Sequence, residues 1–114
     1  MNVVFDVLGA HRPLHASLAA VLADRLREPD HGDERTERQA RELAEEIEDA
    51  LAGRRSDPIP LSGQRADVVF QRLRPAPNPA DRRQLEELDL YRAVRTVHLA
   101  LRADGGSAPA QPSR

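Results

Sequence analysis

The chain of 114 residues contains no cysteine and no lysine, and its only aromatic residues are two phenylalanines and one tyrosine. Without cysteine, a disulfide framework, a thiolate zinc site and a cysteine nucleophile are all excluded. Three aromatic rings are too few for a platform on which single-stranded bases stack. All 17 basic residues are arginine. Together with the abundance of alanine, proline and leucine, this is typical of GC-rich coding DNA and indicates a bacterial origin.

Long apolar segments and targeting signals are also missing. No apolar stretch approaches the roughly 18 residues that a membrane-spanning helix needs. The first six residues, MNVVFD, lack a basic segment and end in Asp6, unlike a signal peptide. Charged residues make up 32% of the chain and the mean hydropathy is -0.61, a balance that favours a folded domain. A net charge of -2 gives the whole chain no general affinity for polyanions. We expect a cytoplasmic protein.

Between the prolines and glycines, the apolar residues recur with helical spacing. This periodicity predicts helices over residues 14–28, 36–52, 62–73 and 78–103. Residues 3–11 fit either a helix or a strand, and we favour a helix because no second strand-like segment is available to pair with it. The predicted fold is therefore all-α, a compact bundle of four to five helices with short proline-rich connections.

The chain is predicted to form one domain over residues 1–103. Residues 104–114 contain no large apolar side chain and are expected to be a disordered tail. Gly53 stands where a left-handed residue would end the helix over 36–52. Ile59 and Leu61, in the loop that follows, are predicted to pack under the bundle.

The last predicted helix is apolar on two sides. One side forms a core stripe of Leu90, Val94, Val97 and Leu101. The second side combines leucine, tyrosine and arginine without any acid, a composition that protein interfaces favour. It is either packed within the domain or exposed to a partner, which would be another protein or a second copy in a homodimer. The candidate interface residues are Leu88, Tyr91, Arg92, Arg95, Leu99 and Arg102.

The helix over 36–52 is acidic, and the charge along the chain is uneven. Residues 1–57 hold 8 arginines and 13 acids, whereas residues 58–114 hold 9 arginines and 6 acids. The acids are either a solvated face with ion pairs four residues apart or a docking surface for a basic partner. The acidic helix could also pack beside the arginine-bearing last helix, within one chain or across a dimer axis.

No catalytic or cofactor motif is present. His11 and His15 have the four-residue spacing of metal ligands on a helix, with Asp6 as the nearest third ligand. Pro13 interrupts that helix, however, so no metal site is expected. The serines lie outside a nucleophile elbow, and no glycine-rich phosphate loop occurs. We therefore expect neither enzymatic activity nor a cofactor.

Nucleic-acid binding is the alternative. The predicted helix over 62–73 and the last helix could form a pair similar to a helix-turn-helix. Its connection holds two prolines and exceeds the usual three to four residues. The arginines around this turn are Arg65, Arg72, Arg74, Arg82 and Arg83. The sequence favours a non-catalytic adaptor or regulatory module that acts through protein–protein contacts. A dimeric DNA-binding transcriptional regulator or antitoxin-like protein is the second hypothesis.

Overall fold

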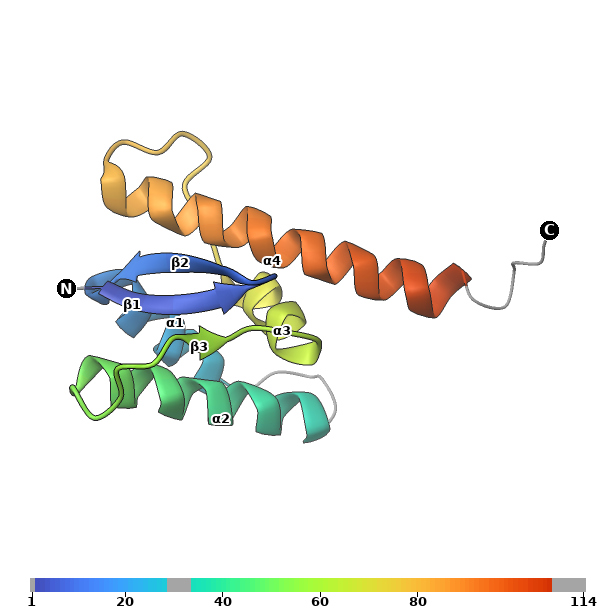
Figure 1. Cartoon of the computed structure of the whole chain (residues 1–114), viewed down its shortest axis with the longest axis horizontal. Helices are drawn as coiled ribbons and strands as arrows, with labels where there is room; N and C mark the ends of the chain where they lie inside the picture. Colours follow the sequence, from blue (N-terminus) through green and yellow to red (C-terminus); the bar gives the residue numbers. More distant parts are fainter. Residues whose placement is uncertain (1, 29–33, 108–114) are drawn as a thin grey trace.

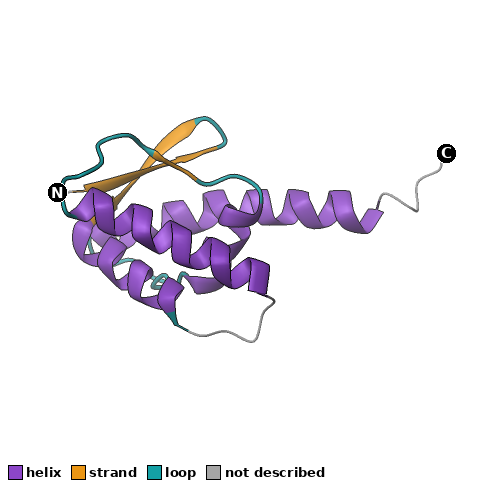
Figure 2. Ribbon diagram, turned by 90° about the horizontal axis from the view of Figure 1, so that it is seen from below, coloured by secondary structure: helices purple, strands orange, loops and turns teal. Residues whose placement is uncertain are grey.

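The computed structural model describes residues 2–28 and 34–107, the last four of these as backbone only. It is a mixed α/β fold, so the predicted all-α class is wrong. A three-stranded sheet lies on one side of the four helices (Figures 1 and 2). In chain order the elements are β1 (Asn2–Val7), β2 (Ala10–His15), α1 (Ala16–Arg27), α2 (Glu34–Leu51), β3 (Ile59–Pro60), α3 (Gln64–Arg72) and α4 (Arg82–Ser107).

The N-terminal segment, for which a helix was favoured, is the first strand of a β-hairpin. Val3, Phe5 and Val7 alternate into the core, as the period of a half-buried strand requires. Leu8 and Gly9 both have positive φ angles, 54° and 80°, which is the pattern of a two-residue type I′ turn. This turn returns the chain directly into β2, which pairs antiparallel with β1.

The sequence did not predict β2, the strand that pairs with β1, because its residues, AHRPLH, are mostly polar and include Pro13. In the strand order β2-β1-β3, β2 is an edge strand. Proline lacks a backbone N–H group, and on an edge strand this need not remove a hydrogen bond between strands. Pro13 therefore lies within a strand, and not in the first turn of a helix. Helix α1 begins later, at Ala16, where His15 Nδ1 accepts a hydrogen bond from the Ser17 amide at 3.1 Å.

The third strand completes the sheet on the other side of β1. Phe5 pairs with Ile59 in parallel register, and the Leu61 amide donates to the Asp6 carbonyl at 2.9 Å. Ile59 and Leu61 are buried, as predicted, although Ile59 belongs to a short strand and Leu61 follows it directly.

The helix ends follow local chemistry. Gly53 has a φ of 79° and ends α2, with its amide bonded to the Ala50 carbonyl and the Arg54 amide to the Asp49 carbonyl. Helix α4 begins at Arg82, where Asp81 Oδ1 accepts from the Gln84 amide at 3.0 Å. It continues to Ser107, so the first four residues of the predicted tail are helical. The rest of that tail, 108–114, lies outside the described residues.

The position of α4 gives the molecule its elongated shape, with a longest extent of 50 Å. Its N-terminal half packs on the body, while its C-terminal part extends past the other elements (Figure 1). Leu90, Val94 and Val97 of the predicted core stripe are buried, but Leu101 is 40% exposed. Within the described part of the chain, no helix is both long and apolar enough to cross a bilayer.

Candidate protein-binding surface on the last helix

One face of α4 carries only leucines and arginines. Successive members are three or four residues apart, which aligns them along one side of a helix. We call this surface the α4 stripe, and it consists of Leu85, Leu88, Arg92, Arg95, Leu99 and Arg102. Leu85 and Leu99 are 48% and 49% exposed, Leu88 is half-buried, and the three arginines are exposed.

The α4 stripe is exposed because the helix packs through its opposite side. Leu90, Val94 and Val97 are buried where α4 meets β2 and α3. At about 100° of rotation per residue, the centre of the stripe lies roughly half a turn away from these three side chains. The stripe therefore faces away from the body of the protein.

Tyr91, a candidate interface anchor, lies at the edge of the stripe and contacts α3. Its ring stacks on Phe70, with centroids 5.1 Å apart, and it packs against the core. Tyr91 and Leu88 line a pocket of about 440 Å³, together with Leu73 and the segment 75–77. The six candidate residues thus lie in two places. Leu88 and Tyr91 line a groove beside α3, and the remaining four form an exposed arginine–leucine surface farther along the helix.

The charge of the exposed surface is one-sided. Between Leu90 and Ala103 the helix contains three arginines, one histidine and no acid. Among the residues that the structure describes, Arg92, Arg95 and Arg102 take part in no ion pair. These guanidinium groups are available to acceptors from another molecule.

Four of the seven acids of α2 pair with arginines of the same chain, and Glu34, Glu42 and Glu45 are exposed. Glu48 contacts Arg27 at 2.6 Å, and Asp49 contacts Arg54 at 2.9 Å. Glu37 lies 3.9 Å from Arg41, one helical turn away. In Figure 1, α2 and α4 lie on opposite sides of the molecule, so the two helices do not pack beside each other within one chain.

Glu46 is the most constrained of these acids. It contacts Arg55 at 3.0 Å and also accepts a hydrogen bond from Arg65, so it joins α2 to the following loop and to α3. The hydrogen bond from Arg65 and the charges of both arginines hold the pKa of Glu46 below its usual value, against the opposing effect of burial. This network stabilises the packing of α3 on α2.

The arginines of the nucleic-acid hypothesis have acceptors within the protein. Arg65 binds Glu46, and Arg83 lies 3.2 Å from Asp81. The backbone carbonyls at the ends of two helices accept the guanidinium groups of Arg72 and Arg74. Arg82 is 3.9 Å from Glu86, and its side chain is 91% exposed. Acids of the same chain thus pair closely with Arg65 and Arg83, whereas Arg72 and Arg74 keep their charge while their donors are engaged by carbonyls.

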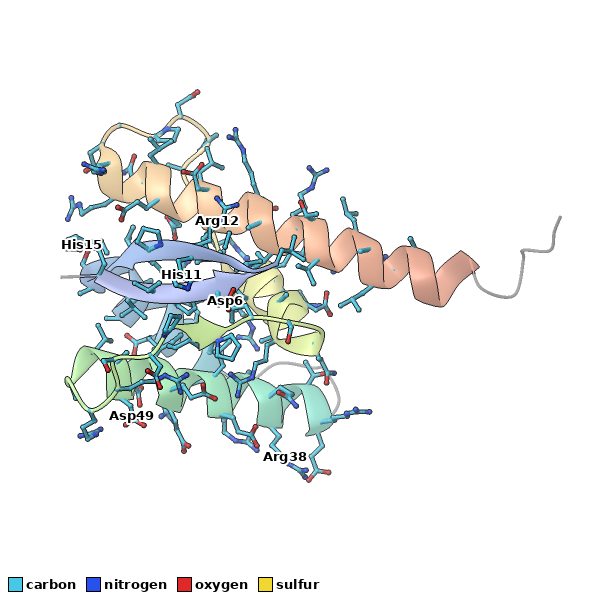
Figure 3. The ribbon with its side chains drawn as sticks, in the orientation of Figure 1. Asp6, His11, Arg12, His15, Arg38 and Asp49 are labelled. Carbon is cyan, nitrogen blue, oxygen red and sulfur yellow. The ribbon has the colours of Figure 1, made fainter. Side chains whose placement is uncertain are left out.

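The histidines near the N-terminus do not form a helical ligand pair. His11 stands opposite Asp6 in the hairpin register, and His15 lies at the far end of β2, beside α1 (Figure 3). Among the described residues, no group of three or more histidine, cysteine or acidic side chains could hold a metal ion.

One polar pair of α4 was missed by sequence reasoning. His98 Nδ1 bonds to Asp67 Oδ1 of α3, and the imidazole ring stacks on Phe70 with centroids 4.5 Å apart. These two residues are 31 positions apart in the chain, and no spacing pattern links them.

Comparison of the chain with protein-family models, with curated proteins and with solved structures finds no match. The α4 stripe is therefore interpreted from its own geometry and charge.

Proposed function

We propose that this protein is a cytoplasmic, non-catalytic interaction module that binds an acidic helical segment of another protein through the α4 stripe. The observation that carries the proposal is the exposed surface in which leucines lie beside arginines that have no ion pair in the described part of the chain. Such a surface combines apolar area with cationic hydrogen-bond donors.

The leucines favour a protein partner over a nucleic acid. Leu85 and Leu99 are each about half exposed, and both would lose water contact against an apolar residue of a partner helix. Complete burial of a leucine is worth about 1.5–3 kcal/mol, a gain that a phosphate backbone does not offer. The arginines between them would pair with carboxylates, which accept two parallel hydrogen bonds from a guanidinium group.

The charge of the α4 stripe itself favours a different protein over a second copy. A symmetric homodimer through this stripe would bring the arginines of the two copies together, since the stripe contains no acid. On α2, four acids pair with the chain's own arginines, whereas Glu34, Glu42 and Glu45 are exposed without an ion pair in the described part of the chain, so the sedimentation experiment below tests an asymmetric contact between copies. We therefore assign the carboxylates to a partner of another sequence.

The test reverses the charges on the protein and then on a synthetic helical peptide that it binds. The probe has leucine and glutamate at alternating three- and four-residue spacings, and it is titrated into the isotope-labelled full chain by NMR. We expect shift changes along residues 85–102, and a dissociation constant at least tenfold weaker for Arg92→Glu combined with Arg95→Glu, since each arginine loses a charge-assisted hydrogen bond. A lysine version of the peptide should recover binding to that double variant.

The matched control is Arg38→Glu, which reverses an exposed charge on α2 and should leave peptide binding unchanged. Three outcomes would overturn the proposal. The first is peptide binding that is equally weak in the control and in the double variant. The second is concentration-dependent dimerisation in sedimentation experiments that the double variant abolishes. The third is tight, salt-sensitive binding of duplex DNA that Arg82→Glu removes.

A further inference from the structure

An open pocket of about 410 Å³ is lined by side chains of α2, α3 and α4, beside the part of α4 that extends past the body. Its polar lining has one arginine from α2, two glutamines and an aspartate from α3, and a histidine and an arginine from α4. These six polar residues are Arg35, Gln64, Asp67, Gln71, His98 and Arg102, and Leu101 completes the lining. Four of these six side chains carry only hydrogen-bond donors or an amide group.

The imidazole of His98 has a defined orientation in this pocket. A carboxylate only accepts hydrogen bonds, so the Nδ1 atom of His98 is the donor to Asp67, and Nε2 is the ring nitrogen left for a ligand. Stacking on Phe70, with the rings inclined by 23°, fixes the plane of the imidazole. The His98 side chain is only 14% exposed. This donor–acceptor pair therefore needs little reorganisation when a ligand binds.

The amide groups are also held in place. Gln71 Nε2 donates to Asp67 Oδ2 at 3.4 Å, and Gln64 Nε2 donates to Thr36 Oγ1 at 3.4 Å. Because these side chains are positioned by neighbours within the protein, a ligand pays less conformational entropy to engage them.

The electrostatic environment favours an anion. Arg35 and Arg102 are exposed and form no ion pair within the described residues. Among the residues that the structure describes, Asp67 is the only acid that lines the pocket, and it is bonded to His98. Glu34 and Glu37 also lie in the first turn of α2, but Glu37 pairs with Arg41. Arg35 and Gln64 lie in the first turns of α2 and α3, so the positive ends of two helix dipoles are close to the pocket.

We propose that this pocket binds a phosphate group, either inorganic phosphate or a phosphate monoester. Arg35 and Arg102 contact its oxygens from two different helices, the two glutamine amides supply neutral donors, and His98 Nε2 accepts the hydrogen bond of a protonated phosphate oxygen. A planar carboxylate offers two oxygens in one plane, whereas phosphate offers its oxygens in several directions and can engage two separate guanidinium groups. The site goes beyond the α4 stripe, with which it shares only Arg102.

The experiment is a titration of the full chain with sodium phosphate at constant ionic strength, followed by amide and histidine NMR shifts. We expect saturable shifts at Arg35, Gln64 and His98. Arg35→Gln should weaken the dissociation constant about tenfold, because one charge-assisted contact is lost. The matched control Arg38→Gln, an exposed arginine of the same helix that does not line the pocket, should bind as the unaltered protein does.

Parallel titrations with phenyl phosphate and sodium acetate identify the ligand chemistry. Tighter binding of phenyl phosphate supports a monoester, equal binding supports inorganic phosphate as a sufficient ligand, and equal binding of acetate overturns the proposal. Non-saturating shifts, or the same loss in Arg35→Gln and Arg38→Gln, would also overturn it. His98→Gln, checked for an unchanged melting temperature, should weaken phosphate binding as well.

The two proposed sites can be tested independently of each other. Arg35→Gln should leave binding of the acidic peptide to the α4 stripe unchanged. Arg92→Glu combined with Arg95→Glu should leave phosphate binding unchanged, since neither residue lines the pocket. A loss of phosphate binding in the latter variant would contradict the separate assignment of this site.

Discussion

Arg25 and Arg72 each hydrogen-bond to the other's main chain. The Arg72 guanidinium group donates to the Arg25 carbonyl at 2.5 Å, and that of Arg25 donates to the Arg72 carbonyl at 3.5 Å. Arg72 also reaches the Glu28 carbonyl at 3.4 Å. The C-terminal ends of α1 and α3 thus meet, and carbonyls at both ends receive cationic donors, the Arg25 carbonyl in addition to the Glu28 amide at 3.2 Å.

Replacing Arg72 should therefore destabilise the fold. Arg72→Met retains much of the apolar stem but leaves the carbonyls of α1 without their cationic donor. We expect a loss of about 1–2 kcal/mol in the free energy of unfolding, measured by urea denaturation. Arg82→Met removes an arginine that is 91% exposed and should change stability by less than about 0.5 kcal/mol. Equal stabilities of the two variants would show that the reciprocal contact contributes nothing.

Glu87 should destabilise the protein at neutral pH. It is only 7% exposed, and burial raises its pKa, partly offset by the charge of Arg25. A carboxyl group whose pKa is raised on folding stabilises the protein while it is protonated, and that stability is lost as the pH rises through the folded-state pKa. Glu87→Gln should thus raise the free energy of unfolding at pH 7, by on the order of 1 kcal/mol, and have little effect near pH 3.

Urea titrations of Glu87→Gln at both pH values measure this difference. Glu86→Gln, on the adjacent residue, serves as the control and should not show the same pH-dependent gain. A variant that is less stable than the unaltered protein at pH 7 would mean that Glu87 is held by an attraction stronger than its desolvation.

Glu46 should have the opposite pH dependence. Its pKa is lowered by Arg65 and Arg55, so it stabilises the fold above its ordinary pKa, and this contribution disappears as the pH falls through the lowered value. Glu46→Gln should lose about 1 kcal/mol at pH 7 and almost nothing near pH 2, measured by chemical denaturation. Glu45→Gln, an exposed neighbour, is the control. An equal loss at both pH values would contradict an ionic origin.

The hairpin turn offers a stabilising substitution. Leu8 has a φ of 54° and is 70% exposed, so it occupies a left-handed conformation without burying much surface. Asparagine tolerates this conformation, and Asn-Gly is a favoured sequence for a type I′ turn. Leu8→Asn should raise the free energy of unfolding by about 0.5–1 kcal/mol, read from the thermal midpoint. A lower midpoint would show that the leucine side chain makes a contact worth more than the backbone strain.

The helices were predictable from sequence because their apolar periodicity is local. The sheet was not predictable from sequence. A strand is recognised together with the strands that pair with it, and the sequences of β2 and β3, the partners of β1, lack the usual pattern of a strand. β2 presents His11, Arg12 and Pro13, and β3 has only two residues. The alternation of Val3, Phe5 and Val7 was visible, but without a partner it could not be told from one face of a short helix.

The two proposed functional surfaces also differ in how far they could be predicted from the sequence. The α4 stripe follows from spacing within one helix, so five of its six residues, all except Leu85, were candidate interface residues from the sequence. The position of Tyr91 against Phe70 depends on how α3 packs and was not predictable. The phosphate pocket draws on three helices, and the bond between Asp67 and His98 joins residues 31 positions apart. Sites of this kind appear only when the tertiary contacts are known.

The central strand β1 imposes an order on biosynthesis. Its neighbour β2 follows after a two-residue turn, so the hairpin can pair soon after His15 leaves the ribosome. Its other neighbour must wait until the Ile59 partner of Phe5 has been made, after α1 and α2. Until then one edge of β1 is unpaired and open to strands of other chains. Translation products that stop before residue 59 should therefore self-associate, whereas the full chain covers that edge with its own backbone.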